Sequence, residues 1–221
     1  MQRPRLIIGI SGATGIIYGV RLLQVARVLQ IETHLVVTKA GERTLAYETD
    51  VTIQELRSMA DHTYPDADIG AAIASGSFPT IGMVVAPCSV HSLAEIAHST
   101  TDGLLTRAAD VCLKERRRLV LLFREAPLHA GHIRSMAAAT ENGAIVFPPV
   151  PAFYTRPDTV AEIVDHTVGR VLDLFGLDAG LVQRWTGQQN RQRQQSADTC
   201  MPRRSDPLGR QTSPGVSPVE Q

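Results

Sequence analysis

The sequence predicts an α/β fold in three layers, with helices covering both faces of a mostly parallel sheet. Strand-like apolar runs alternate with helical patterns from residue 5 to residue 177, an order typical of right-handed βαβ units. Two of the runs, MVVAP at 83–87 and LVLLF at 119–123, are unbroken, as expected of strands buried on both faces. A glycine-rich turn, SGATG at 11–15, separates the first strand from the first helix.

In the first part of the chain, strands and helices alternate up to a long polar stretch. Thr52 is expected to cap a helix in which Glu55 completes a capping box. Residues 61–78 are small and polar and are expected to form a functional loop. The elements expected before it are a strand at 5–10, a helix carrying Leu22 to Leu29, a strand at 32–40, a helix at 42–49 and a helix at 52–61.

The second part of the chain continues the alternation. Gly143 is expected just past the end of an alanine-rich helix, where glycine is favoured. The expected elements are a strand at 83–87, helices at 92–99 and 104–116, a strand at 119–123, a helix at 132–144, a short proline-broken strand within 144–154 and an amphipathic helix at 160–177.

The chain divides into one domain and a tail. Residues 1–187 carry the apolar periodicity of a single core, whereas residues 188–221 are rich in Gln, Arg, Pro and Ser and almost lack large apolar side chains. Such a composition cannot offset its own ordering entropy. We expect residues 1–187 to form the folded domain and residues 188–221 to lack order without a partner.

The composition argues against several classes of partner. Lys plus Arg and Asp plus Glu both total 22, so the formal net charge is zero, which disfavours nucleic acid and membrane surfaces. Three cysteines without metal or redox spacing, and the lack of a signal segment or an 18-residue apolar run, predict a cytoplasmic protein with reduced thiols.

Polar residues follow the two unbroken strands at the point where each ends. Cys88-Ser89-Val90-His91-Ser92 follows the first, and Arg124-Glu125 follows the second. Ligands of open parallel sheets bind beyond the carboxyl ends of the strands. The two segments are therefore expected to line one site.

The glycine-rich turn at 11–15 directly precedes a helix. The amides of the turn and the N-terminus of the helix are therefore suited to bind an anion such as phosphate. A dinucleotide-binding protein usually has an acidic residue at the end of the second strand, and Thr38-Lys39 stands there instead. This disfavours NAD and favours the phosphate of a mononucleotide.

Two other pairs of residues give weaker evidence for a catalytic or metal site. Cys88 and His91 could form a nucleophile and its base, but a cysteine after an apolar strand is more often a buried filler, and no carboxylate is obvious nearby to orient the histidine. His129 and His132 have metal-ligand spacing without a clear third ligand. No resident metal is expected.

Several segments in order resemble the UbiX-type flavin prenyltransferases, a family also described as aromatic-acid decarboxylase subunits. The likeness covers roughly residues 6–185. It is carried by GISGATGIIYGVRLL, TKAGERTLAYETD, SGSFPTIGMVVAPCSVHSLAEIA, DGLLTRAADVCLKERRRLVLLFREAPLH, GAIVFPPVPAFYTRP and QRW.

The resemblance implies a flavodoxin-like (Rossmann-like) sheet that binds FMN and transfers a dimethylallyl group from dimethylallyl phosphate to N5 and C6 of reduced FMN. The prenylated FMN would serve a UbiD-type decarboxylase, and the family usually builds its sites between subunits of a homododecamer. By position, the FMN contacts would be Gly12, Ala13, Thr14, Thr38, Ser89, Val90, His91, Ser92 and Arg124. The dimethylallyl phosphate contacts would be Tyr154, Arg170, Lys114, Arg124, Ser75 and Arg107.

Four of the side chains implied by the resemblance would act in catalysis: Glu48, Glu125, Lys114 and Tyr154. No DDxxD-type run is present to hold magnesium on a diphosphate, so a monophosphate bound by cations and a phenol without a metal fits better. Thr14 and Thr38 stand where serine is commoner, and each retains its hydroxyl. Two alternatives remain open, an FMN-dependent cysteine-type decarboxylase and a non-catalytic FMN carrier.

Overall fold

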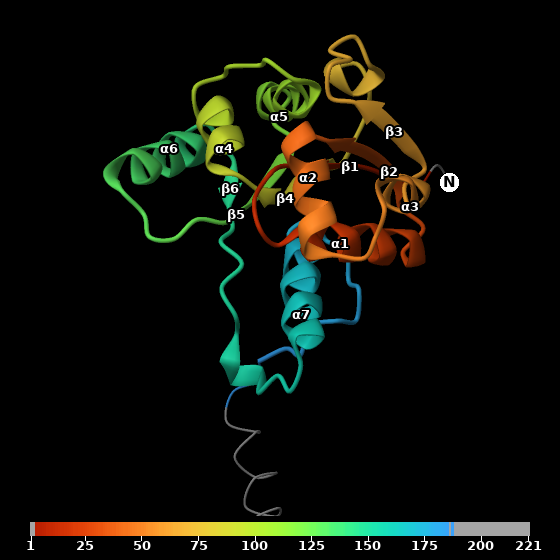
Figure 1. Cartoon of the computed structure of the whole chain (residues 1–221), viewed down its shortest axis with the longest axis vertical. Coiled ribbons are helices and arrows are strands. Elements are labelled where there is room, and N and C mark those ends of the chain that lie inside the picture. Colours follow the sequence, from red (N-terminus) through yellow and green to blue (C-terminus); the bar gives the residue numbers. More distant parts are fainter. Residues whose placement is uncertain (1–2, 186, 188–221) are drawn as a thin grey trace, which may run out of the picture. The chain divides into compact units, whose positions relative to one another are not determined.

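The computed structural model of the chain describes residues 3–185 and 187, and its centre is a six-stranded sheet in the order β3-β2-β1-β4-β5-β6 (Figure 1). Every neighbouring pair of strands is parallel, so the predicted parallel sheet is confirmed. The strands are β1 (Arg5–Ile10), β2 (Glu32–Val37), β3 (His62–Pro65), β4 (Gly82–Cys88), β5 (Arg118–Phe123) and β6 (Ile145–Val146).

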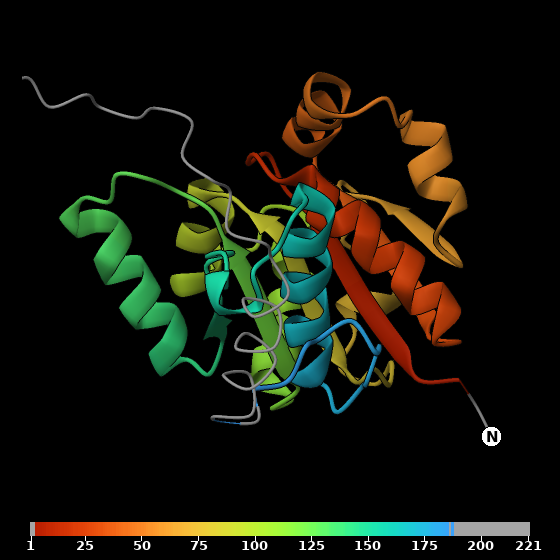
Figure 2. The ribbon, with the colours of Figure 1, turned by 90° about the horizontal axis from the view of Figure 1, so that it is seen from below.

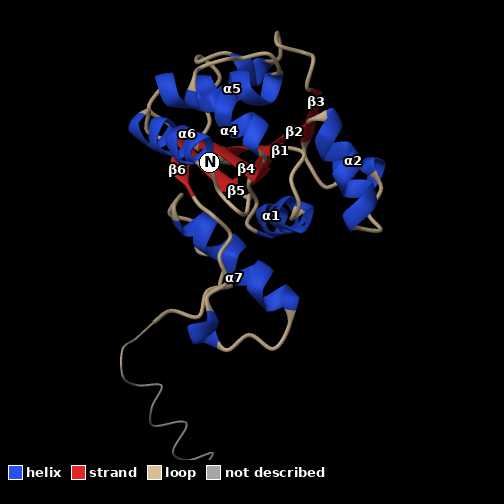
Figure 3. Cartoon of the chain, turned by 60° about the vertical axis from the view of Figure 1, so that its left-hand side comes forward, coloured by secondary structure: helices blue, strands red, loops and turns tan. Residues whose placement is uncertain are grey.

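Helices cover both faces of the sheet, which confirms the three-layer α/β/α prediction. Figure 3 shows α4, α5 and α6 on one side and α1 and α7 on the other, and in Figure 2 α1 and α7 lie side by side. The helices are α1 (Ile16–Val28), α2 (Lys39–Glu48), α3 (Ile53–Ser58), α4 (Val90–Ala97), α5 (Leu104–Lys114), α6 (Ala130–Glu141) and α7 (Val160–Asp173), with short 3₁₀ turns η1 (Ala72–Ala74) and η2 (Phe153–Thr155).

The strands bury both faces, as their unbroken apolar runs predict. All seven residues of β4 are buried, as are five of the six in β5. Successive side chains of a strand point to opposite faces. Leu6 and Ile8 of β1 therefore join the core under α1 and α7, whereas Ile7 joins the core under α4, α5 and α6.

The prediction of a loop over residues 61–78 was wrong. The segment contains the edge strand β3, which pairs in parallel with β2, and the turn η1. β3 has the sequence HTYP, and none of its four residues is fully buried. Because an exposed edge strand needs no continuous apolar run, hydrophobic periodicity could not reveal it.

Helix boundaries also differ from the predicted ones. β2 ends at Val37, and Thr38 is the N-cap of α2, so the predicted strand 32–40 is shorter and the helix begins earlier. The capping box of Thr52 and Glu55 is present at α3, as predicted. The last strand is reduced to two residues, Ile145 and Val146.

By its internal contacts the chain separates after Gln183 into two units. The first contains the whole sheet and all the helices given above. The predicted tail, residues 188–221, lies outside the described residues. In the part of the chain that the structure describes, no helix has the length and apolarity needed to cross a membrane.

Candidate functional site

A cavity of about 960 Å³ lies beyond the carboxyl ends of the strands. Residues within two positions of the ends of β1, β2, β3, β4 and β5 line it. In the strand order the chain moves outward from β1 to β3 on one side and from β4 to β6 on the other. The cavity therefore lies at the topological switch point between β1 and β4, where doubly wound sheets bind their ligands.

A buried hydroxyl joins the two loops at the switch point. The Ser11 Oγ donates to the carbonyl oxygen of Pro87 at 3.0 Å and accepts from the amide of Ser89 at 2.8 Å. Ser11 is 1% exposed. The glycine-rich turn after β1 and the CSVHS loop after β4 are thereby held together at the floor of the cavity.

Helices α1, α2, α4 and α5 begin close to the cavity, and two of the predicted flavin-contact hydroxyls cap α2 and α4. Thr38 Oγ1 accepts from the amide of Gly41 at the start of α2, and Ser89 Oγ accepts from the amide of Ser92 at the start of α4. These caps leave the first-turn amides of α2 and α4 directed toward the cavity side of the sheet, an arrangement that favours anions.

Helix α1 is capped by a side chain from another element. Its N-cap residue is Gly15, in the left-handed region at φ +101°, which offers no side chain. Glu48 Oε2 accepts from the amides of Gly15 at 2.8 Å and Ile16 at 3.0 Å. Glu48, predicted to be catalytic, therefore neutralises the positive end of α1 in this structure and is not among the residues that line the cavity.

Gly12 allows the turn after β1 to approach α2 closely. A Cβ atom at Gly12 would clash with the Cβ of Ala40 and lie 3.1 Å from the Ala40 carbonyl carbon. Because two of the contacts are with backbone atoms, neither segment could give way easily. The close packing places Ala13 and Thr14 at the rim of the cavity.

The structure brings together every residue that the resemblance assigns to FMN. All of them line this one cavity, and the predicted acid Glu125 lines it too. The set is Gly12, Ala13, Thr14, Thr38, Ser89, Val90, His91, Ser92, Arg124 and Glu125.

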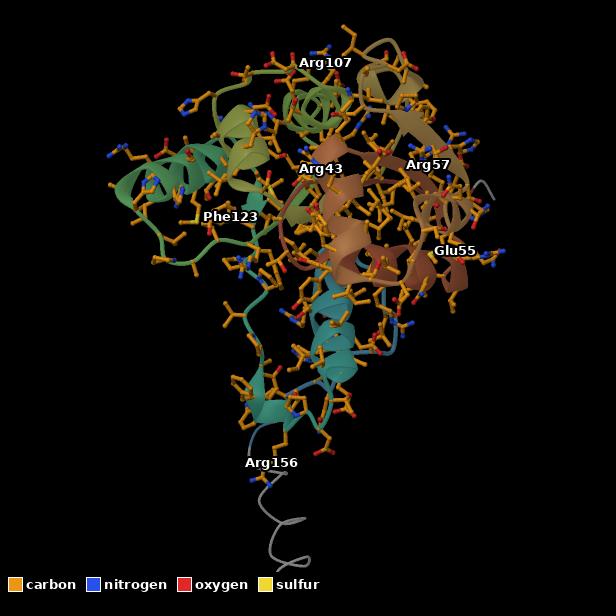
Figure 4. The ribbon with its side chains drawn as sticks, viewed as in Figure 1. Arg43, Glu55, Arg57, Arg107, Phe123 and Arg156 are labelled. Atoms are coloured by element: carbon orange, nitrogen blue, oxygen red, sulfur yellow. The ribbon has the colours of Figure 1, made fainter. Side chains whose placement is uncertain are left out.

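The residues assigned to the prenyl phosphate lie elsewhere in the chain, apart from Arg124. Tyr154 is in η2, and its hydroxyl lies 3.5 Å from Nε2 of His166 on α7. Arg170, also on α7, pairs with Asp173 at 3.0 Å. Neither Tyr154 nor Arg170 lines the cavity. In Figure 4 the neighbouring Arg156 lies far from both Arg43 and Arg107.

A third group lies along α5 and η1. Arg107 pairs with Asp110 at 2.9 Å, and Lys114 pairs with Glu115. Ser75 Oγ hydrogen-bonds to Ser77 Oγ at 2.9 Å. None of Arg107, Lys114 and Ser75 lines the cavity, so five of the predicted phosphate contacts stand apart from the predicted flavin contacts.

Comparison with known proteins decides the family. A family model described as Flavoprotein matches residues 1–172. The flavin prenyltransferase UbiX of Escherichia coli (strain K12) is 58% identical over 186 residues, which cover 83% of this chain and 98% of that protein. The chain belongs to the UbiX family of flavin prenyltransferases.

Solved structures agree with this placement. AnUbiX (PadA1), crystallised in complex with FMN and dimethylallyl pyrophosphate, matches with a TM-score of 0.83 and 47% identity over 84% of this chain and 99% of that one. A dodecameric FMN-dependent Ubix-like decarboxylase from Escherichia coli O157:H7 matches with a TM-score of 0.81 and 48% identity over 83% and 100% of the two chains. These matches confirm the predicted fold and the predicted resemblance.

Within this UbiX-family cavity, sequence reasoning missed several charged residues. The basic one on α2 is Arg43, and it lines the cavity together with Lys39, which was named from the sequence; Figure 4 shows Arg43 toward the end of α2 nearest α4 and α5. Lys39 stands in the Thr38-Lys39 pair that already favoured a mononucleotide phosphate, whereas Arg43, four residues further along the same segment, had no such signal. Arg57, on α3, also lines the cavity and pairs with Glu42 at 2.7 Å.

An acidic group on the other side of the cavity was missed as well. It consists of Asp66, Glu95 and Asp102. Burial raises the pKa of Glu95; His91, 3.4 Å away, lowers it, while Asp102 and Asp66 raise it. Asp66 also accepts from the amide of Leu105 at 2.9 Å, which ties the end of β3 to the start of α5. Its position depends on β3, the strand that periodicity did not reveal.

Cys88 behaves as the buried filler that the sequence favours over a nucleophile. The side chain is fully buried at the end of β4, and burial raises the pKa of its thiol. A thiol with a raised pKa provides little thiolate for attack. His91, three residues after the cysteine, instead pairs with Glu95, one helical turn further on, and no hydrogen bond between His91 and Cys88 is found among the described residues.

Proposed function

We propose that this chain transfers a dimethylallyl group from dimethylallyl phosphate to N5 and C6 of reduced FMN and that the prenylated FMN serves a UbiD-type decarboxylase. The observation that carries the proposal is the single cavity at the switch point, lined by all nine residues that the family resemblance assigns to FMN. Membership of the UbiX family supports the reaction.

The residues of the cavity fit a flavin mononucleotide. Gly12 permits a backbone turn close to α2, the hydroxyls of Thr14 and Ser92 offer hydrogen bonds, and Lys39, Arg43 and Arg124 supply positive charge for a phosphate. When bound, reduced FMN supplies the electron-rich atoms that accept the prenyl group. Val37, Val90 and Leu105 give the cavity apolar surface against which a planar ring can pack.

We propose that Arg124 and Glu125 act on the leaving phosphate. Arg124 follows β5 directly, and its amide donates to the Cys88 carbonyl oxygen at 3.2 Å, which fixes the start of the segment beside the CSVHS loop. A guanidinium carried by this segment stabilises negative charge as it develops on the departing phosphate. Glu125, next along the cavity wall, is positioned to donate its carboxyl proton to that phosphate.

The remaining predicted contacts require a second copy of the chain. Tyr154, Arg170 and Lys114 lie outside the cavity of their own chain, so we propose that a neighbouring subunit brings them to it. Large apolar side chains are exposed near Tyr154, with Phe153 70% and Val150 75% exposed, as expected of an interface. A homododecamer is the proposed assembly, in keeping with the dodecameric structural relative.

The direct test is anaerobic incubation of the protein with reduced FMN and dimethylallyl phosphate, followed by the mass of the extracted flavin. We expect a gain of one prenyl unit. Dimethylallyl pyrophosphate is run in parallel, because the AnUbiX structure contains that compound. A flavin of unchanged mass with both donors would reject the proposal.

A second experiment separates a transferase from an FMN carrier. Glu125→Gln keeps the size of the side chain and its place in the cavity but cannot supply the carboxyl proton. A transferase should keep its FMN affinity and lose product formation, whereas a carrier should still activate a UbiD-type decarboxylase. Turnover of a cysteine-ended peptide by oxidised FMN would instead favour the cysteine-type decarboxylase. The cytoplasmic location remains a prediction from the sequence.

A further inference from the structure

A cluster of metal-ligand side chains lies at the opposite end of the sheet from the cavity. Among the described residues, Glu32, His34 and His62 form one group of three whose ligand atoms all lie within 4.8 Å of one another. Glu32 and His34 are two residues apart on β2 and share a face of the sheet. His62 begins β3 and is the parallel partner of His34. The strand register therefore builds the cluster.

The distances approach those of a metal site. Nε2 of His34 lies 3.1 Å from Oε1 of Glu32, and Nε2 of His62 lies 3.5 Å from the same oxygen. Zinc bonds to nitrogen and oxygen are about 2.0–2.2 Å, so two ligand atoms in a tetrahedral site are roughly 3.3–3.5 Å apart. The ligand atoms are thus already spaced as one ion requires, and the side chains need only reorient around it.

A second observation supports a site of this kind. Nδ1 of His34 lies 2.9 Å from the hydroxyl of Tyr64, which is two residues after His62 on the same strand. Histidines that bind metals usually donate their other ring N–H to a neighbouring oxygen, which fixes the orientation of the ring. With Nδ1–H donating to the Tyr64 oxygen, the lone pair of Nε2 is directed at the centre of the cluster.

We propose that Glu32, His34 and His62 bind one divalent transition-metal ion, of which zinc fits the ligand set best, with water completing the coordination. Two imidazoles and one carboxylate are a known ligand set for zinc. His34 is 2% exposed and Glu32 18% exposed at the side chain, while His62 is 53% exposed. Two of the three ligands are thus largely buried, and solvent and the ion reach the site past the exposed His62.

Two features must adjust when an ion binds. The Nε of Arg5 donates to Oε1 of Glu32 at 3.0 Å, and this contact competes with the ion. The guanidinium of Arg5 also lies over the Phe78 ring, 4.8 Å from its centroid, and this contact can persist when the ion displaces Arg5 from Glu32. The rings of His34 and His62 are stacked at 4.7 Å and 15°, so the exposed His62 ring must turn to direct its nitrogen at the ion.

The proposed site differs from the flavin cavity in place and in role. Glu32 begins β2 and Val37 ends it, a separation of about 17 Å at 3.3 Å per residue. An ion there would join the edge strand β3 to β2. Since Asp66 follows β3 and lines the cavity, the ion would stabilise the strand that holds one wall of the cavity without touching the reactants.

The test uses full-length protein stripped with a chelator, then titrated calorimetrically with Zn²⁺ and spectroscopically with Co²⁺. We expect one ion per chain, with the intense visible absorption of four-coordinate cobalt. His62→Ala should weaken binding more than about tenfold, and Tyr64→Phe by about tenfold or more because the orienting hydroxyl is lost. His98→Ala, an exposed histidine at the end of α4, is the matched control and should bind as the parent does.

Three results would overturn the proposal. The first is a lack of saturable binding, and the second is equal metal affinity in His62→Ala and the parent. The third is loss of binding in His132→Ala instead, which would assign the ion to the His129 and His132 pair. Circular dichroism of metal-free His62→Ala checks that the exposed substitution leaves the fold intact, and Tyr64→Phe provides an independent variant. Prenyl transfer should persist in stripped protein, so this proposal and the proposed function fail separately.

Discussion

The predicted flavin contacts and the predicted prenyl-phosphate contacts are built in different ways. The first group follows the ends of strands and converges on one cavity within a single chain. Apart from Arg124, the second lies on α5, α7, η1 and η2, outside that cavity. Strand ends meet because the sheet topology brings them together, whereas helix faces meet only when something packs on them. One chain thus forms the flavin half of the proposed site and leaves the donor half to assembly.

Arg124 is the residue common to both groups, so its loss should have the largest effect. Arg124→Ala is expected to reduce the rate of prenyl transfer about 10²–10³-fold, as removal of a fixed group that stabilises developing charge typically does. The rate is measured by the mass of the flavin product. Arg134→Ala, an exposed arginine on α6, is the control, and equal rates in the two variants would contradict the role of Arg124.

Mixed assemblies would show whether two chains share one site. Arg124→Ala and Tyr154→Phe should each be impaired alone, because each damages one half of every site. Co-expressed with different tags and purified as mixed oligomers, they should regain part of the parent rate at sites where an intact cavity meets an intact Tyr154. Mixed oligomers that are no more active than the single variants would show that the two halves do not combine across subunits.

Gly12→Ala should damage the flavin half alone. The added methyl would meet the Cβ and backbone of Ala40, and overpacking of this kind costs about 1–3 kcal/mol. We expect a lower urea midpoint and weaker FMN binding. Gly70→Ala is the control, because its Cβ would come no closer than 3.6 Å to Asp68 Oδ1. Unchanged stability and FMN affinity in Gly12→Ala would contradict the close packing of the turn on α2.

The smallest effect is expected at Glu95. Burial raises the pKa of its carboxyl in the folded chain, so the folded state holds the proton more tightly than the unfolded state does. Stability is therefore favoured at low pH and falls as the pH rises from the ordinary glutamate pKa to the raised one. Glu95→Gln should be more stable than the parent at pH 7, and the gap should close below about pH 4.

The measurement is the urea midpoint of both proteins across this pH range. Glu141→Gln, an exposed acid at the end of α6, is the control and should follow the parent at every pH. A Glu95→Gln variant that is less stable than the parent at pH 7 would show that the ionised carboxylate is needed for folding.

Local patterns predicted the central part of the fold well. The unbroken runs in β4 and β5 and the capping box at Thr52 were recognisable because burial on both faces and helix capping leave short-range signals. The cavity was predictable for the same reason, since its residues directly follow those strands.

Non-local contacts were not predictable from the sequence. The pairing of β3 with β2 decides where Asp66 lies, and HTYP has no apolar alternation to reveal it. The contact of Glu48 with the amides of Gly15 and Ile16 joins residues more than thirty positions apart. No local pattern reveals that contact, and the catalytic role expected of Glu48 remains a prediction. The chain position of Tyr154 likewise carries no information about a subunit interface.

The hydroxyl of Ser11 has a consequence for how a flat aromatic ligand gains entry. It joins the segments after β1 and β4 through two hydrogen bonds and is 1% exposed, so these two segments are tied together beneath an incoming ring system. At the opposite border Asp66 also makes two hydrogen bonds, accepting from the amides of Leu104 and Leu105 at the start of α5, but the strand before it is an exposed edge strand. We therefore expect the pocket to open, if at all, on the side of the edge strand, while a tricyclic ring packs against a base that is already held together.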